Sequence, residues 1–245
     1  MTQGQLIEAE KRRRRYQSKI GKFGKAKFDE LEEIDSVNFV YTTLTTEGIP
    51  ITREDASLAY KFSQKNIKSL RDENLRVALD MIKGLRFVKE SKTGVSFDFI
   101  LKLHQIIMAQ YADKTPGSIR DVPAYIYLKS QEKVEEIGFK PTSPEMIGKK
   151  LGELINWYNS NVSKMNAIEF GAILHLRFFA IHPFKDGNKR MSRLLLNKAF
   201  FDLGYPLLNL SKLSQDYFDA LIASVEGKEE KAFVEFVYER FIADI

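Results

Sequence analysis

Residues 181–193 bring together side chains that bind phosphate, hold a metal ion and move a proton. The segment lies between two strongly apolar helical patterns. Its chemically capable residues are, in chain order, His182, Asp186, Gly187, Asn188, Lys189, Arg190 and Arg193. Structural loops rarely concentrate so many ionisable groups in a dozen residues, so this composition indicates a functional loop.

The start of the helix that follows the loop is suited to bind an anion. Asn188 can cap a helix that begins near Lys189, which leaves free backbone N–H groups at the positive end of the helix dipole. Gly187 lets a bound group approach the backbone closely. Arg190 and Arg193 are three residues apart, so they share one helix face and can reach the same phosphate chain.

Two further side chains add a metal ligand and a proton acceptor. Asp186 supplies a hard oxygen ligand, and one carboxylate together with phosphate oxygens is a common way to hold Mg²⁺ at a nucleotide site. His182, at the end of a buried helix, can act as a general base near neutral pH. Together these residues predict a metal–nucleotide site with a proton acceptor beside it.

Each of these residues also has a purely structural interpretation. A histidine before a proline commonly makes a hydrogen bond at a helix end, and an Asp-Gly-Asn segment is commonly a turn. Arginines three residues apart commonly lie on a solvated face. His104 and His175 are expected to be packing or hydrogen-bonding residues. For the loop, the order and spacing of the whole set favour function.

The surrounding sequence predicts an all-α fold with a small β-hairpin. Residues 167–181 are apolar on nearly every side, so they should form the buried central helix, which Pro183 ends. Residues 122–128 favour a strand, and Pro123 places that strand at a sheet edge. Other apolar patterns predict helices that begin near residues 28, 36, 52, 72, 96, 143, 191, 214 and 229.

Composition limits the classes of function. The chain of 245 residues is long enough for a substantial core, and no repeat or linker divides it. It has no cysteine, which excludes disulfides, cysteine-bound zinc and a thiol nucleophile within it. No apolar run is long enough to cross a membrane, and the N-terminus lacks the apolar core of a signal peptide. We therefore expect a cytoplasmic protein without a membrane partner.

The positive charge is concentrated in the first 27 residues. They carry nine Lys or Arg against Glu8 and Glu10, a net charge of +7, whereas the whole chain carries +5. The remaining residues are therefore close to neutral. We interpret residues 1–27 as a basic arm or weakly ordered helix before a single domain at residues 28–245. No nucleic-acid partner is expected, because the charge is not spread over a folded face.

At residues 182–193 the chain resembles the Fic (filamentation-induced-by-cAMP) family. The family signature is His-x-Phe-x-(Asp/Glu)-Gly-Asn-(Gly/Lys)-Arg-x-x-Arg, and every fixed position is present. The resemblance extends over about residues 35–240. Residues 116–120 and the strand that follows are similar to the substrate-docking flap of the family, here at about 117–130. Residues 217–221 are similar to its adenine-side helix.

The resemblance implies transfer of AMP from ATP to a Ser, Thr or Tyr hydroxyl of a target protein that docks on the flap. His182 would take the hydroxyl proton, Asp186 would hold Mg²⁺ on the phosphates, and Phe184 would anchor the loop. Arg190 and nearby backbone N–H groups would stabilise the developing charge. The implied nucleotide contacts are Gly187, Asn188, Lys189, Arg190, Arg193 and Tyr217, with Arg193 placing the γ-phosphate.

The family also has an inhibitory pattern, (Ser/Thr)-x-x-x-Glu-(Gly/Asn), which residues 43–48 match. The match lies at the end of a predicted helix at about 36–47, upstream of the active loop and helix at 182–203. This is the arrangement of family members with an N-terminal inhibitory helix. The resemblance implies that Glu47 pairs with Arg193 and withdraws it from the γ-phosphate.

Lys189 stands where many family members have glycine, and it keeps a second reaction open. The death-on-curing branch of the family carries lysine there, so the chain could instead be a phosphotransferase that binds ATP in the reverse direction. A non-catalytic nucleotide-binding regulator and removal of AMP from targets are further alternatives. The sequence does not name the target, and it leaves open a homodimer that covers the inhibited surface.

Overall fold

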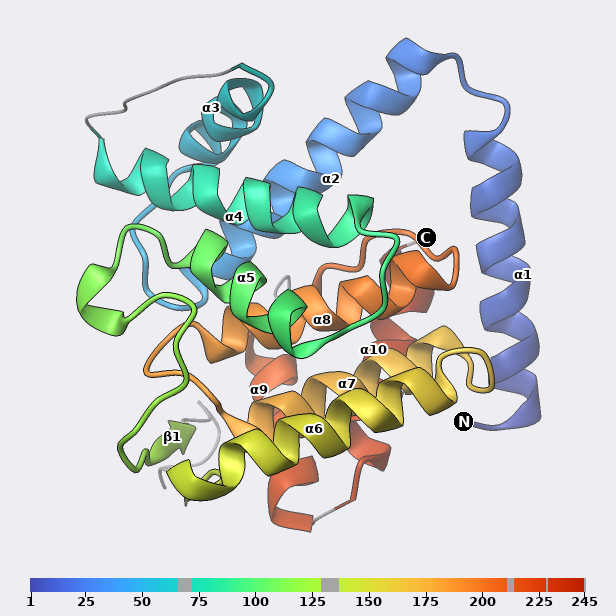
Figure 1. The fold of residues 1–245 in the computed structure, drawn as a ribbon. Helices are drawn as coiled ribbons and strands as arrows, with labels where there is room; N and C mark the ends of the chain where they lie inside the picture. Colours follow the sequence, from blue (N-terminus) through green and yellow to red (C-terminus); the bar gives the residue numbers. More distant parts are fainter. Residues whose placement is uncertain (66–71, 129–136, 211–213, 228, 245) are drawn as a thin grey trace.

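In the computed structural model, the described residues (1–65, 72–128, 137–210, 214–227 and 229–244) form ten α-helices and one β-hairpin (Figure 1). The helices are α1 (Gln3–Ile20), α2 (Lys25–Thr45), α3 (Arg53–Ser63), α4 (Glu73–Glu90), α5 (Phe97–Ile107), α6 (Pro144–Asn161), α7 (Ala167–Ile181), α8 (Asn188–Asp202), α9 (Ser214–Gly227) and α10 (Lys231–Asp244). A 3-10 turn spans Ala112–Lys114, and the strands are β1 (Ile126–Leu128) and β2 (Ile137–Phe139). None of the helices within these ranges has the length and apolar character needed to cross a membrane. The predicted all-α fold with a small hairpin is confirmed.

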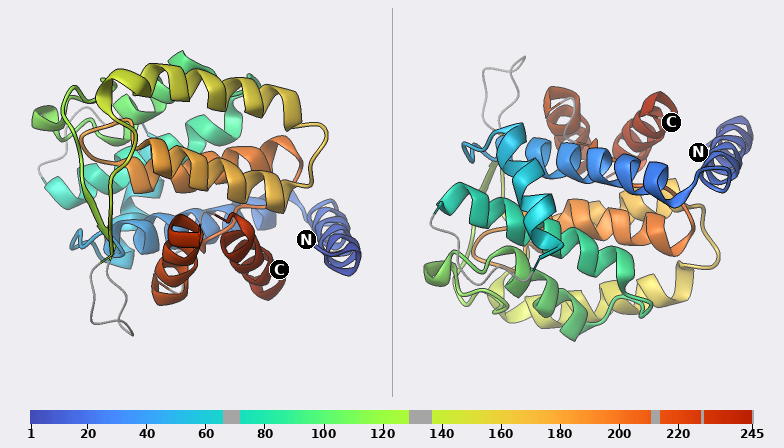
Figure 2. Two further views of the ribbon diagram at one scale, coloured as in Figure 1. Left: turned by 90° about the horizontal axis from the view of Figure 1, so that it is seen from below. Right: turned by 90° about the horizontal axis from the view of Figure 1, so that it is seen from above.

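Helix α7 lies at the centre of the fold, between α6 on one side and α9 and α10 on the other (Figure 2). Its apolar side chains point in all directions and belong to two cores. Phe170, Leu174 and Phe178 pack with α2 to α6, whereas Ile168 and Phe179 pack with α9 and α10. A helix that is apolar all round is a buried helix, so the predicted central helix is confirmed.

Local signals fix the ends of the helices that lead to the site. Thr52 and Asp55 form a capping box at the start of α3, and the Ser96 side chain accepts from a backbone N–H at the start of α5. Gly48, with φ of 78°, turns the chain sharply after α2. This left-handed turn is easy for glycine, and it leaves Glu47 at the very end of the helix.

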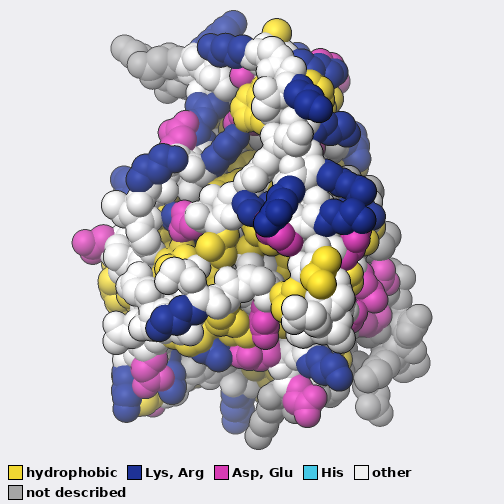
Figure 3. All heavy atoms as spheres, turned by 90° about the vertical axis from the view of Figure 1, so that its right-hand side faces the viewer, with side chains coloured by type: hydrophobic (Ala, Val, Ile, Leu, Met, Phe, Trp, Pro, Cys, Tyr) yellow, Lys and Arg dark blue, Asp and Glu magenta, His cyan; other side chains and the backbone are white. Residues whose placement is uncertain are grey.

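Residues 1–27 are more regular than the weakly ordered arm that the sequence predicts. α1 is a capped helix that packs along α10. The Gln17 amide donates to the Gly204 carbonyl oxygen at 2.9 Å, and the Gln5 amide donates to a Glu235 carboxylate oxygen at 2.6 Å. Lys and Arg side chains gather along the outward face of α1 (Figure 3). The basic charge thus belongs to an ordered helix joined to the C-terminal part of the fold.

The strand predicted at residues 122–128 is shorter in the structure. Only its last three residues form β1, which pairs with β2 in antiparallel register. Pro123 has no N–H to give to a ladder, and the Val122 carbonyl oxygen accepts from the Arg120 side chain at 2.8 Å. Val122 and Pro123 therefore do not extend the strand. Residues 129 and 130 of the predicted flap lie outside the described residues.

Close packing between α4 and α5 gives a first prediction. A Cβ added at Gly84 would lie 2.3 Å from Ile107 Cγ2. We expect Gly84→Ala to lower the free energy of unfolding by about 1–3 kcal/mol through overpacking, although alanine is the better helix former. The control Gly148→Ala on α6, where the new methyl group meets nothing within 4 Å, should raise it by about 0.5–1 kcal/mol. Urea denaturation followed by circular dichroism measures both. A stabilised Gly84→Ala protein would contradict this packing.

Candidate active site

The loop between α7 and α8 turns at two residues in the left-handed conformation. His182 ends α7 with φ of 49°, and Gly187 precedes α8 with φ of 75°. Glycine adopts this conformation readily, whereas it is costly for other residues. A Cβ on Gly187 would also lie 2.8 Å from Met108 Sδ. The loop therefore needs glycine at 187 and holds His182 in a strained conformation.

Asn188 closes the loop instead of capping the helix. α8 begins at Asn188 itself, and no side chain caps it. Asn188 Oδ1 accepts from the Phe184 N–H at 3.0 Å, and Asn188 Nδ2 donates to the Phe184 carbonyl oxygen at 2.8 Å. The predicted cap is wrong because this side chain is already bound to both backbone groups of Phe184. The N–H groups of the first turn of α8 are left for an anion, as the sequence predicts.

Phe184 anchors the loop in the core. It is fully buried, and its ring stacks on His104 with centroids 3.6 Å apart. His104 Nδ1 accepts from the Gly117 N–H at 2.8 Å, so Nε2 carries the proton and donates to the Asp186 carbonyl oxygen at 3.1 Å. Phe184 is thus an anchor and His104 a hydrogen-bonding residue, as expected. Through His104 the start of the predicted flap is joined to the loop.

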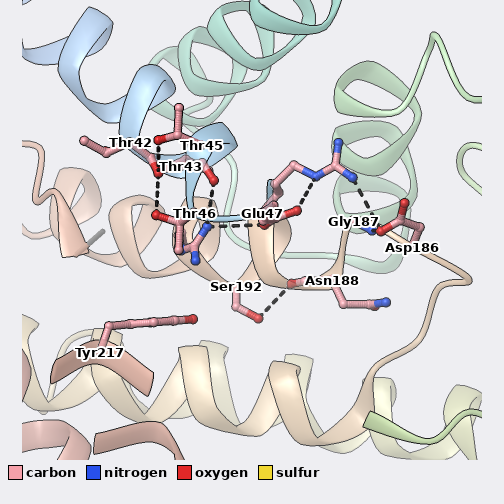
Figure 4. Close-up of polar contacts among 12 residues, drawn as sticks. Thr42, Thr43, Thr45, Thr46, Glu47, Asp186, Gly187, Asn188, Ser192 and Tyr217 are labelled. Atoms are coloured by element: carbon pink, nitrogen blue, oxygen red, sulfur yellow. Dashed lines mark hydrogen bonds and ion pairs between the residues drawn. The ribbon is translucent and has the colours of Figure 1, made fainter. Parts of the chain in front are cut away.

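Glu47 lies between the two arginines of α8 (Figure 4). Its Oε1 is 3.2 Å from Arg193 Nη1, and its Oε2 is 3.1 Å from Arg190 Nε. The Glu47 side chain is 8% exposed and the arginine side chains at most 2%. The predicted contact with Arg193 is present, and the contact with Arg190 is additional. Because all three charges are buried, removal of one leaves the others without compensation.

Besides Glu47, Arg193 contacts the end of α2 and the Tyr217 ring. Its Nη1 also donates to the Thr43 carbonyl oxygen at 3.2 Å, which fixes the end of α2. The Tyr217 ring lies 4.9 Å from the guanidinium carbon. Tyr217 is fully buried, and its hydroxyl lies 3.1 Å from His175 Nε2. The structure therefore places Tyr217 behind Arg193, where it supports the arginine and presents no exposed ring to an adenine.

Some N–H groups of the two buried arginines have no hydrogen-bond acceptor in the described part of the chain. Arg190 Nη1 and Arg193 Nε are buried and lack a hydrogen-bond partner among the described residues. Leaving such a donor unsatisfied costs about 1–3 kcal/mol. An anion with several oxygens, such as a phosphate chain, would satisfy these donors and also neutralise the charge.

Asp186 is the solvent-facing carboxylate of the loop, with 45% of its side chain exposed. Its Oδ1 accepts from the Gly187 N–H at 2.6 Å and lies 3.5 Å from Arg190 Nη2. Within the described ranges, no group of three acidic or histidine side chains is placed to hold a metal ion. A single half-exposed carboxylate fits Mg²⁺ where phosphate oxygens complete the coordination. These residues therefore suit a metal ion that arrives with a nucleotide.

The His182 imidazole is neutral at neutral pH. Burial lowers its pKa from 6.5 to about 4, and the positive charges of Arg120 and Lys189 act in the same direction. The Phe179 backbone and Asp186 oppose this shift. The ring is only partly buried and packs edge-on against Phe179. A neutral, accessible imidazole can accept a proton, as a general base must.

The structure brings most of the predicted site residues to one place. The active loop and the first turns of α8 supply His182, Asp186, Gly187, Asn188, Arg190 and Arg193, and the end of α2 supplies Glu47. Lys189 lies at the side of α9, with its ammonium group 5.8 Å from the centroid of the Phe218 ring. Lys189 thus lies at the border of the site, whereas Tyr217 packs against Arg193.

Two residues that the sequence does not single out also shape the site. The Arg120 Nε donates to the His182 carbonyl oxygen at 2.7 Å, and the Tyr111 ring lies 5.5 Å from the Arg190 guanidinium carbon. Both come from the segment between α5 and β1. No periodic pattern or motif spacing connects that segment with the loop, so only the three-dimensional structure reveals these contacts.

His104 makes stability depend on pH. Burial lowers its pKa from 6.5 to about 4, so between these values the unfolded chain binds a proton that the folded chain excludes. Stability should therefore fall as the pH is lowered, by about 2 kcal/mol from this residue between about pH 7 and pH 5. We expect His104→Gln to lose less stability than the wild type over this interval in urea denaturation. Equal losses in the two proteins would contradict the assignment.

The chain is similar in sequence to known proteins. The model of the Fic/DOC family matches residues 94–200, which include the active loop. The chain is 29% identical over 185 residues to protein adenylyltransferase fic-1 of Caenorhabditis briggsae, covering 73% of this chain and 34% of that protein. Protein adenylyltransferase Fic of Drosophila ananassae is 27% identical over 211 residues, 84% of this chain and 39% of that protein. The chain spans between a third and two fifths of the length of these relatives.

Solved structures share the fold along almost the whole chain. A Fic domain containing signaling protein from Bacteroides thetaiotaomicron has a TM-score of 0.82 at 20% identity, covering 98% of this chain and 93% of that one. Fic-1 from C. elegans has a TM-score of 0.77 at 25% identity, covering 98% of this chain and 68% of that one. The family match includes the His182 loop, and the shared fold includes the helices on either side of it. Residues 94–200 therefore match the Fic/DOC family model, and almost the whole chain shares the fold of these solved Fic proteins.

Proposed function

We propose that this chain transfers AMP from ATP to a Ser, Thr or Tyr hydroxyl of a target protein. The observation that carries the proposal is the neutral His182 in the same loop as a half-exposed carboxylate and the N-terminus of α8, beside two buried arginines. This set can accept a proton and bind a phosphate chain. The activity in the names of the curated relatives, protein adenylyltransferase, agrees with that chemistry.

In the proposed reaction, His182 takes the proton from the target hydroxyl. The hydroxyl oxygen attacks the α-phosphorus of ATP, the bond to the bridging oxygen breaks, and pyrophosphate leaves. Arg190 and the backbone N–H groups around Gly187 and Asn188 stabilise the negative charge on the phosphate oxygens. Asp186 would hold Mg²⁺ together with the phosphates, and the ion would supply charge neutralisation. The target docks on the flap at about residues 117–130.

We further propose that Glu47 restrains this reaction. Its carboxylate forms an ion pair with Arg193, which would otherwise place the γ-phosphate. It also forms an ion pair with Arg190. A nucleotide must displace this carboxylate to reach both arginines. While Glu47 stays in place, ATP binds with its phosphates in a nonproductive position.

The restraint predicts the effect of two substitutions. We expect Glu47→Gly to increase the self-modification of the protein with labelled ATP and Mg²⁺ by at least about tenfold, since the charge-assisted contacts to Arg193 become available to the γ-phosphate. Adding His182→Ala to Glu47→Gly should abolish the product, although ATP still binds. Mass spectrometry of the intact protein measures the adduct. Equal, low modification of wild type and Glu47→Gly would argue against inhibition by Glu47.

The transferred group can be identified by the position of the label. Phosphate transfer is the alternative because Lys189 replaces glycine, but its ammonium group faces Phe218 on α9. We therefore expect label from the α-phosphate of ATP to appear on the Glu47→Gly protein, and no label from the γ-phosphate. Incorporation of γ-phosphate label alone would contradict AMP transfer. No label at either position, with a His182→Ala protein that keeps its biological effect, would favour a non-catalytic regulator.

A further inference from the structure

Arg120 is a buried cation whose side-chain hydrogen bonds to the described residues all go to backbone carbonyl groups. It is 2% exposed and lies between the 3-10 turn and β1. Its Nε donates to the His182 carbonyl oxygen at 2.7 Å and its Nη1 to the Val122 carbonyl oxygen at 2.8 Å. Its Nη2 donates to the Thr142 carbonyl oxygen. One guanidinium group thus joins three separate segments of the chain.

These segments are the active loop and the two ends of the β-hairpin, the first of which belongs to the flap predicted at about 117–130. Val122 precedes β1, and Thr142 follows β2. Backbone hydrogen bonds reinforce the junction, because the Arg120 N–H donates to the Pro183 carbonyl oxygen at 2.9 Å and the Thr142 N–H to the Ala180 carbonyl oxygen at 3.2 Å. Both ends of the β-hairpin are therefore attached to the end of α7, next to His182.

A contribution to stability alone does not explain why an arginine is buried at position 120. Among the described residues, no carboxylate lies within ion-pair distance of Arg120, and burial alone lowers its pKa. Burying a cation without an anion is unfavourable unless its donors are satisfied. The planar guanidinium offers five N–H donors in fixed directions. Here one of these donors meets the His182 carbonyl group at the negative end of α7, where a cation is favourable.

The contact with the His182 carbonyl group has a particular consequence. His182 has φ of 49° and ψ of 59°, a conformation that non-glycine residues adopt at a cost of about 1–3 kcal/mol. A hydrogen bond to its carbonyl oxygen holds the peptide plane that follows and so fixes ψ of His182. The backbone conformation in turn sets the direction of the Cα–Cβ bond, which carries the imidazole. We propose that Arg120 is a positioning residue that holds the His182 base in its left-handed conformation and joins it to the docking flap. This proposal rests on the proposed AMP transfer.

The test compares Arg120→Lys and Arg120→Gln in the Glu47→Gly background. We expect Arg120→Lys, which keeps the charge but not the three contacts, to slow self-modification at saturating ATP by about 10- to 100-fold, because a displaced base no longer reaches the hydroxyl. The ATP concentration for half-maximal rate should stay unchanged. Arg86→Lys is the matched control, because Arg86 donates to the Ser63 carbonyl oxygen at 2.8 Å on the far side of α4. It should leave the rate unchanged.

Nuclear magnetic resonance of the same variants gives a readout that does not depend on activity. The Cα and Cβ chemical shifts of His182 report its left-handed conformation, and we expect both Arg120 variants to lose it. The charges near His182 are Arg120 from the flap segment, Asp186 from the loop and Lys189 from α8. Since Arg120 lowers the His182 pKa, Arg120→Gln should raise that pKa and Arg120→Lys should not.

The outcomes separate the two proposals. If Glu47→Gly forms no AMP product but His182 changes conformation in the Arg120 variants, AMP transfer is wrong and the positioning of His182 stands. If the product forms but Arg120→Lys reacts as fast as Arg86→Lys, the positioning role is wrong. Unchanged His182 chemical shifts in both Arg120 variants would also overturn it. If Arg120→Gln melts at a much lower temperature than the Glu47→Gly protein, the conclusion is drawn from Arg120→Lys, which keeps the charge.

Discussion

One buried carboxylate, Glu47, forms ion pairs with two buried guanidinium groups on α8. This interaction constrains both helices that supply it, because a buried charge must keep a partner of the opposite sign. α2 must end where it does, with Gly48 turning the chain, so that Glu47 reaches α8. α8 must present Arg190 and Arg193 on the same face. In the proposed function the same two arginines bind the phosphates of ATP, so the interaction that holds α2 to α8 would also restrain the reaction.

The active loop is held by hydrogen bonds within the loop and by side chains from α5 and the segment that follows α5. Asn188 closes it on Phe184, His104 donates to the Asp186 carbonyl group, and Arg120 donates to the His182 carbonyl group. These contacts use backbone groups and leave the Asp186 carboxylate and the His182 ring available. Preorganisation of this kind favours catalysis, because donors and the base need not be reordered during the reaction. The loop is thus fixed in geometry, and under the proposed function the access of a nucleotide to the arginines of α8 is what Glu47 regulates.

The sequence predicts those features that local patterns determine. The central helix follows from an apolar composition on all faces, the caps at Thr52 and Ser96 from short-range hydrogen bonding, and the pairing of Glu47 with Arg193 from two motifs. Other features depend on contacts between distant segments, which no local pattern encodes. The Asn188 side chain binds Phe184 and not the helix N–H groups, and β2 is recognisable only by its pairing. The regularity of α1 depends in part on contacts with Gly204 and Glu235, almost at the other end of the chain.

The most direct test of competition between Glu47 and the terminal phosphates is the affinity for nucleotides of different length. Isothermal titration calorimetry with ATP and with AMP, on wild type and on Glu47→Gln, separates the contribution of the β- and γ-phosphates from that of the rest of the nucleotide. If Glu47 competes with these phosphates for Arg190 and Arg193, Glu47→Gln should tighten ATP binding by about tenfold or more and leave AMP binding nearly unchanged. Equal changes for ATP and AMP, or no change for either, would contradict the competition.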